Sequence, residues 1–176
     1  MNVWAKMNER VADNAVTTPG SIRLAVIADN SIFRTSVMRI LKGADGIEVV
    51  GEGATVVDAL KVARELVPDV MLLNLDARDE GAKAAASIAR VCPNVRTLIL
   101  TASGNEQDVT MALQAGARGY MMTNSSTREV VDTVRSIVGD NTRAMPTLEP
   151  RLLITSGEEI KTIVSDNLRD LKIRKE

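Results

Sequence analysis

The sequence predicts an α/β domain built on a five-stranded parallel, doubly wound sheet with helices on both faces. Two observations lead to this class. Short apolar runs rich in β-branched residues alternate five times with longer segments whose apolar residues recur at helical spacing, and this order is typical of a parallel sheet covered by helices. The strand candidates are also almost continuously apolar, which indicates that both faces of the sheet are buried.

The expected elements follow one another with short connections. Strands are expected at residues 22–29, 47–52, 69–75, 95–102 and 119–123. Helices are expected at residues 32–41, 56–66, 80–91, 106–115 and 127–138. Glycine and proline mark the helix ends, at Gly43, Gly46, Pro68, Pro93 and Gly116. These boundaries define one domain over residues 21–139.

Two tails flank this domain. Residues 1–20 are expected to form an N-terminal tail, in which a short helix would place Trp4 on an apolar stripe. Either this helix frays, as terminal helices do, or its apolar stripe docks on a partner. Residues 140–157 are expected to be a linker, and residues 158–176 an amphipathic C-terminal helix. The apolar face of that helix would consist of Ile160, Ile163, Val164, Leu168 and Leu171.

Composition excludes several classes of protein. The chain has 176 residues and a formal net charge of -1, so no global field attracts nucleic acid or an anionic membrane. Its single cysteine, Cys92, cannot form an intramolecular disulfide, which favours the reducing cytoplasm. No apolar run approaches the ~20 residues of a membrane span. Because the chain contains no histidine, triads and metal sites that need imidazole are excluded.

Several phrases in the expected domain resemble one family. The segments VIADNSIFR, GIEVVGE, PDVMLLNL, LILTAS and AGARGYMM occur in this order and are similar to the receiver domain of bacterial response regulators, in particular the NarL/FixJ subfamily. The resemblance covers roughly two-thirds of the chain. It implies a flavodoxin-like receiver sheet, in which a ligand site forms beyond the carboxyl ends of the strands.

The resemblance also implies a phosphorylation site, which is degenerate here. In receivers an aspartate at the end of the third strand takes a phosphoryl group, an acidic pair after the first strand helps hold Mg²⁺, and a Thr or Ser and a Lys contact the phosphoryl oxygens. The matching positions in this chain are Asp29 and Asn30 for the acidic pair, Asn74 for the phosphoacceptor, Thr101 for the hydroxyl and Thr123 for the lysine.

These replacements predict a site without phosphoryl chemistry. An amide oxygen is a poor nucleophile, so phosphorylation at Asn74 is chemically blocked. With two of the three carboxylates replaced by amides, we expect Mg²⁺ binding to be weak or absent, and we expect no other cofactor. Asp76 is a surrogate acid only if it reaches the site, which we consider the less favoured alternative. Thr101 and Tyr120 match the family's switch pair, although the favoured interpretation is that Tyr120 is simply an amphipathic side chain at a strand edge.

The C-terminal phrase IKTIVSDNLRDLKIR resembles the recognition helix of a LuxR-type helix-turn-helix domain. The chain between Pro150 and Glu158 is too short for the scaffold helices that support such a helix in the major groove, so the segment would be a truncated remnant. Acidic residues share it, which favours a solvated face. Its candidate nucleic-acid contacts are Lys161, Arg169, Lys172, Arg174 and Lys175.

The sequence therefore predicts an atypical, phosphorylation-independent response regulator that is not an enzyme and acts through protein contacts. The expected partners are a second copy of the chain, a histidine kinase or another regulator, with residues 106–115, 119–123 and 127–138 as the contact surface. The alternative is a dimeric transcription regulator that binds DNA through the C-terminal helix. A nucleotide- or flavin-binding enzyme is disfavoured, because ADNSIF contains no glycine-rich phosphate cradle.

Overall fold

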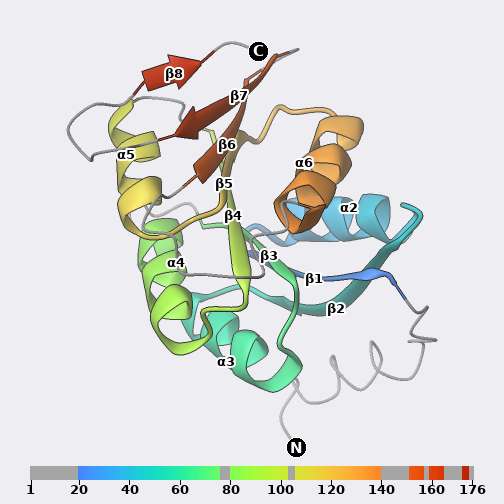
Figure 1. The fold of residues 1–176 in the computed structure, drawn as a ribbon. Coiled ribbons are helices and arrows are strands. Elements are labelled where there is room, and N and C mark those ends of the chain that lie inside the picture. Colours follow the sequence, from blue (N-terminus) through green and yellow to red (C-terminus); the bar gives the residue numbers. More distant parts are fainter. Residues whose placement is uncertain are drawn as a thin grey trace, which may run out of the picture.

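The computed structural model describes residues 20–75, 80–102 and 106–139, together with the backbone of three C-terminal strands at 151–156, 159–164 and 172–174. Figure 1 shows these elements as one sheet with helices packed on both sides. The predicted N-terminal tail with Trp4 lies outside the described residues, apart from Gly20.

The first five strands form the parallel sheet that the sequence predicts. Their order is β2-β1-β3-β4-β5, and every pairing among them is parallel. This order has its switch point between β1 and β3, where ligand crevices form in open α/β sheets. The fold class is therefore confirmed for these strands. Their bounds are β1 (Ile22–Ala28), β2 (Ile47–Gly53), β3 (Val70–Asn74), β4 (Arg96–Thr101) and β5 (Gly119–Met122).

Five helices cover the two faces of this sheet (Figure 1). Alternate strand residues divide between two buried clusters, since successive side chains of a strand point to opposite faces. Ala25, Ile27 and Met71 belong to the cluster beneath α3, α4 and α5, whereas Leu24 and Val26 belong to the cluster beneath α2 and α6. The helix bounds are α2 (Ser31–Lys42), α3 (Val56–Leu66), α4 (Glu80–Val91), α5 (Glu106–Gln114) and α6 (Thr127–Gly139).

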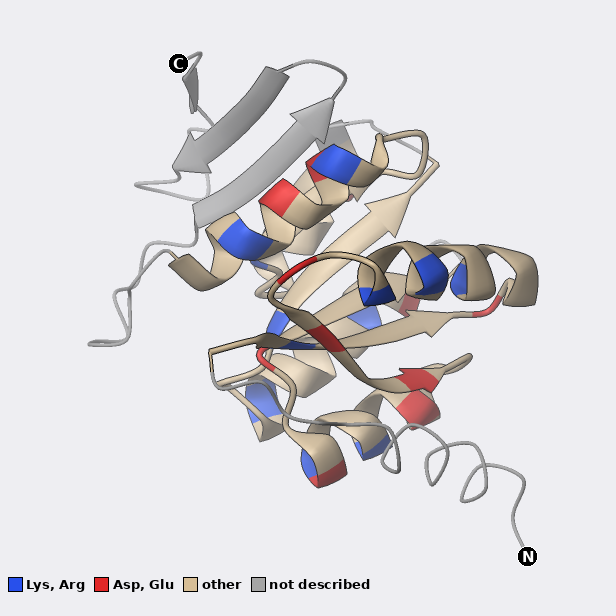
Figure 2. Cartoon of the chain, turned by 90° about the vertical axis from the view of Figure 1, so that its right-hand side faces the viewer, with Lys and Arg blue, Asp and Glu red and all other residues tan. Residues whose placement is uncertain are grey.

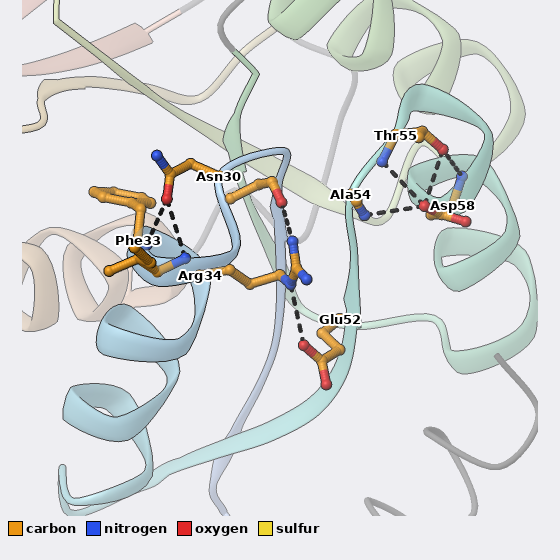
Figure 3. Close-up of polar contacts among 9 residues, drawn as sticks. Asn30, Phe33, Arg34, Glu52, Ala54, Thr55 and Asp58 are labelled. Carbon is orange, nitrogen blue, oxygen red and sulfur yellow. Dashed lines mark hydrogen bonds and ion pairs between the residues drawn. The ribbon is translucent and has the colours of Figure 1, made fainter. Parts of the chain in front are cut away.

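The start of α3 is fixed by a capping box. The Oγ1 atom of Thr55 accepts a hydrogen bond from the backbone N–H of Asp58 at 3.1 Å. In return Oδ2 of Asp58 accepts from the backbone N–H groups of Ala54 and Thr55 and from the Thr55 hydroxyl, at 2.9, 3.0 and 2.9 Å (Figure 3). Because these donors have no partner within the helix, the carboxylate defines where the chain leaves β2 and α3 begins.

The prediction for the C-terminus was wrong. A linker was expected over 140–157 and a helix over 158–176, but the described residues of these segments form β6 (Arg151–Ser156), β7 (Glu159–Val164) and β8 (Lys172–Arg174). The rest of both segments lies outside the described residues. Strand β6 pairs in parallel with β5, and β7 pairs antiparallel with both β6 and β8. The strand β5 is therefore an internal strand of an eight-stranded sheet rather than its edge.

The reason for this difference lies in residue type. The spacing of Ile160, Ile163 and Val164 fits a helix face, but an apolar run this short is ambiguous by periodicity alone. With Thr162 these residues make four of the six positions of β7 β-branched, and β-branched side chains favour strands. Ser156 of β6 pairs with Glu159 of β7, so the two strands run antiparallel to each other along the sheet.

No helix among the described residues is both long and apolar enough to cross a lipid bilayer.

We predict that Asp58→Ala lowers the free energy of unfolding by about 1 to 2 kcal/mol, because three donors at the start of α3 lose their acceptor. Urea denaturation followed by circular dichroism measures this change. Glu65→Ala is the matched control, since it removes an exposed acid from the same helix and should leave stability within about 0.5 kcal/mol of the native protein. Equal effects of the two substitutions would contradict the capping role.

Candidate functional site

A cavity of about 220 Å³ lies at the carboxyl ends of β3 and β4, beneath α4 and α5. Its position is where parallel sheets place ligand sites. The polar side chains that line it are Asn74, Thr101, Asp108 and Tyr120. The structure thus brings together three of the residues that the sequence analysis singled out, Asn74, Thr101 and Tyr120.

Asn74 is the last residue of β3 and only 6% of it is exposed. Its Nδ2 amide donates a hydrogen bond to the backbone carbonyl of Leu100 at 3.1 Å. This bond joins β3 to β4 just inside the cavity. A carboxylate could not make it, because an ionised aspartate has acceptors only and would face the Leu100 carbonyl oxygen with like partial charge. The local structure therefore uses the property that distinguishes asparagine from aspartate.

Asp29 and Asn30 follow β1 and are exposed. The backbone N–H of Asp29 donates to the Asn74 carbonyl at 3.3 Å, and its Oδ1 accepts from the backbone N–H of Asn30 at 2.7 Å. Neither residue is among the described residues that line the cavity. The β1 residue in register with Asn74 is Ala28, so a methyl group occupies the neighbouring strand position.

Asn30 has a structural task at this position. Its Oδ1 accepts hydrogen bonds from the backbone N–H groups of Ile32 and Phe33, each at 3.0 Å (Figure 3). The residue is the N-cap of α2, with extended backbone dihedrals. The side-chain oxygen that could otherwise reach an ion is therefore committed to the start of the helix.

Tyr120 is 2% exposed and points into the core beneath α5. Burial raises the pKa of its phenol, the nearby Asp108 carboxylate raises it further, and a hydrogen bond with the Thr101 side chain lowers it. The switch pair of the sequence analysis is thus in contact, with the tyrosine ring inward. The sequence analysis did not identify Asp108. Its position in the first turns of the helix after β4 nevertheless predicts that it lies near the carboxyl ends of the strands.

The remaining predicted residues lie elsewhere. The backbone N–H of Thr123 donates to the Thr101 carbonyl at 2.8 Å, but Thr123 is not among the described residues that line the cavity. Asp76 lies outside the described residues, as do Arg169 and Lys175. Lys161 lies in β7, and Lys172 and Arg174 lie in β8.

Arg34 is a second residue that the sequence analysis missed. Its Nε is 3.2 Å from Oε2 of Glu52 on β2, and the two side chains are only 16% and 19% exposed. Its Nη1 also donates to the Ala28 carbonyl, as Figure 3 shows. This ion pair ties α2 to the ends of β1 and β2. The sequence does indicate this contact, because Arg34 lies one helical turn after the Asn30 cap, and that position places its guanidinium over the strand ends.

This set of side chains fits a magnesium ion poorly. Mg²⁺ prefers an octahedral shell that includes one or two carboxylates. The Asn30 oxygen caps α2. Asp29 donates its backbone N–H to the Asn74 carbonyl but does not line the cavity, and Asp108 is the only carboxylate among the described residues that do. The described residues also contain no group of three acidic or cysteine side chains placed to hold a metal ion.

Comparison with known proteins relates this chain to one family. The model described as "Response regulator receiver domain" matches residues 24–135. The chain is 30% identical over 136 residues to the response regulator GacA of Pseudomonas aeruginosa, which covers 77% of this chain and 64% of GacA. It is 30% identical over 142 residues to the response regulator protein VraR of Staphylococcus aureus, covering 80% of this chain and 66% of VraR. The chain therefore matches slightly less than two thirds of the length of these relatives.

A solved structure resembles the chain equally well. The signal receiver domain of the putative response regulator NarL from Mycobacterium tuberculosis superimposes with a TM-score of 0.64 and 31% sequence identity. The superposition covers 69% of this chain and 99% of that receiver domain. The part of the chain that matches is thus a complete receiver domain.

We predict that Asn74→Asp lowers the free energy of unfolding at pH 7 by about 1 to 3 kcal/mol, because a buried carboxylate replaces the donor to Leu100. The deficit should shrink as the pH falls toward ~3.9, since the protonated acid can donate to the same carbonyl. Denaturant titrations at several pH values measure both effects. Asn124→Asp, the same change at an exposed position, should cost much less; a similar cost at both positions would contradict the role of the Leu100 bond.

We predict that Tyr120 titrates above its ordinary pKa of 10.0. It is the only tyrosine of the chain, so the ultraviolet absorbance of phenolate reports on it alone. Asp108→Asn should lower the pKa by removing a negative charge, and Thr101→Val should raise it by removing a hydrogen bond. Because the pKa of Tyr120 is raised in the folded protein, its neutral phenol contributes to the free energy of unfolding. This contribution is fully present below pH ~10 and is lost as the pH rises through the folded-state pKa. An unchanged pKa in Asp108→Asn would refute the electrostatic contact.

Proposed function

This chain belongs to the response regulator receiver family, and from that premise we propose that it is an atypical regulator that works in signal transduction or transcriptional control without aspartyl phosphorylation. The observation that carries the proposal is the amide of Asn74, which is held by its hydrogen bond to Leu100; the resemblance assigns this residue to the position of the phosphoacceptor.

The chemistry of the amide supports this proposal. Formation of an acyl phosphate requires a carboxylate oxygen that attacks phosphorus, and the amide of Asn74 supplies neither the negative charge nor a free lone pair on nitrogen. The 3.1 Å bond also commits the nitrogen to the Leu100 carbonyl. Phosphoryl transfer would therefore lack its nucleophile even if a phosphodonor entered the cavity.

The surroundings of Asn74 support the same conclusion. Charge on a transferring phosphoryl group is normally neutralised by a metal ion and a cation. Here the resemblance assigns the lysine position to Thr123, and Asp108 is the only carboxylate among the described residues that line the cavity. We infer weak or absent Mg²⁺ binding and no enzymatic activity. The joint replacement of the nucleophile, the metal ligands and the cation fits this proposal, because each of these charged groups would be costly to bury without the others.

A regulator without phosphorylation must take its signal from a partner. A bound partner shifts the equilibrium between two conformations only by its differential affinity for them. The buried Tyr120, bonded to Thr101, is the element that such a partner would shift. We propose a cytoplasmic protein that contacts a second copy, a histidine kinase or another regulator through α5 and α6. Because β5 is already paired with β6, these helices rather than the β5 backbone would form the contact.

We do not extend the proposal to DNA binding through a C-terminal helix. Residues 159–164 and 172–174 form strands, whereas a recognition helix must lie in the major groove. Figure 2 shows basic and acidic positions dispersed over the described elements rather than gathered by sign on one face. The formal net charge of -1 gives no global attraction to phosphates.

The test of this proposal is incubation with acetyl phosphate and Mg²⁺ followed by intact-mass measurement. We expect no phosphate on the native chain, because Asn74 offers no nucleophile. A receiver that keeps its aspartate, treated in the same way, verifies the reagent, and Asn74→Asp shows whether restoring the carboxylate alone is enough.

A stoichiometric adduct on the native chain would overturn the proposal. Peptide mapping would then identify the acceptor, with Asp76 tested first by Asp76→Asn. Hydroxylamine sensitivity distinguishes an acyl phosphate from a phosphate on a hydroxyl group.

A further inference from the structure

The cavity beside Asn74 is large enough to hold an organic molecule. Its volume is about 220 Å³. An apolar cavity of about 150 Å³ is known to bind benzene, so a cavity of this size accommodates roughly nine non-hydrogen atoms. That is smaller than the sites of about 300 to 1,000 Å³ that hold drug-sized ligands. The size alone therefore selects a small metabolite or fragment.

The walls of the cavity are mostly apolar. Side chains of Leu75, Ile99, Met111 and Ala112 line it, and they come from the end of β3, from β4 and from α5. Such walls favour an apolar body in the ligand, because its burial removes hydrocarbon surface from water. A fully hydrated inorganic ion has no apolar surface to pack against these walls.

One acceptor at the cavity is already oriented. The amide of Asn74 is held by the bond from Nδ2 to Leu100, and among the described residues no donor bonds to its Oδ1 atom. The residue is 94% buried, as its exposed fraction of 6% implies. This oxygen is not one of the fully buried unpaired atoms among the described residues, so it can accept a hydrogen bond from a ligand that carries an N–H or O–H group.

The charge at the cavity is negative. Asp108 is the only charged side chain among the described residues that line it. Its carboxylate already disfavours ionisation of the Tyr120 phenol, which shows that its field reaches the inner wall. In a partly enclosed site of lowered dielectric constant, such a charge attracts a cation more strongly than it would in water.

We propose that this cavity binds a small organic ammonium compound, with the ammonium group between the Asp108 carboxylate and Oδ1 of Asn74 and the apolar body against Ile99 and Met111. An ammonium group supplies three donors, which the Asp108 carboxylate and the Asn74 Oδ1 atom can accept. The apolar body fills the volume that the side chains leave. This inference goes beyond the proposed function and does not depend on it, because a cavity with this lining would bind an amine whether or not the chain accepts phosphate.

The experiment uses phenethylamine, an ammonium compound of about nine non-hydrogen atoms, the size that the cavity predicts. Titration of the ¹⁵N-labelled full-length chain, followed by NMR, should shift the amide signals of Gly81, Thr101 and Ala112, with a dissociation constant of about 1 mM or lower. Phenethyl alcohol, with the same shape and no charge, should bind at least about tenfold more weakly. Phenylacetate, an anion, should not bind.

Two pairs of variants locate the site. Asp108→Asn should weaken phenethylamine binding by about tenfold or more, whereas Asp45→Asn, the same change at an exposed loop acid, should leave it within about twofold. Ala82→Leu places a larger side chain at the cavity wall and should abolish binding. Ala86→Leu, on the exposed side of the same helix, should not.

Three outcomes would overturn the inference. These are no saturable shifts with phenethylamine, equal affinity for phenethyl alcohol, or unchanged affinity in both Asp108→Asn and Ala82→Leu. If Asp108→Asn failed to fold, the Ala82→Leu and Ala86→Leu pair would still decide the location. Binding is read by NMR and phosphorylation by mass, so a failure of either proposal is visible separately from the other.

Discussion

The hydrogen bond from the Asn74 amide to the Leu100 carbonyl is the contact on which the site depends. It joins the ends of two adjacent strands at a buried position and requires a donor that aspartate lacks. Under the proposed function, the carboxylates and the lysine that serve a phosphoryl group would have no anion to balance. The neutral character of Asn30, Ala28 and Thr123 is consistent with this one constraint.

The polar side chains at the start of α2 make structural contacts. Asn30 caps α2, and one turn later Arg34 pairs with Glu52 and holds the Ala28 carbonyl. The start of α2 is thereby tied to the ends of β1 and β2 by charge-assisted hydrogen bonds in a partly buried setting, where such bonds are strong.

The opposite side of the site keeps a linked set of groups. Tyr120 connects β5 to the core beneath α5, contacts Thr101 at the end of β4 and lies in the field of Asp108. The backbone N–H of Thr123 is bonded to the Thr101 carbonyl, so the two strand ends are joined. The β5–β6 pairing adds a further restraint, since a strand paired on both sides has fewer ways to move than an edge strand.

The sequence by itself determined the five-stranded parallel sheet, its helices to within a few residues, and the identity of the side chains at the strand ends, because periodicity and punctuation are local properties. It could not separate helix from strand around Ile160, where both periods fit and pairing with β6 decided the outcome. Nor could it reveal the partners of Asp108 and Arg34, the Leu100 bond or the cavity. Those contacts join residues distant in the chain, and only tertiary packing sets which atoms meet.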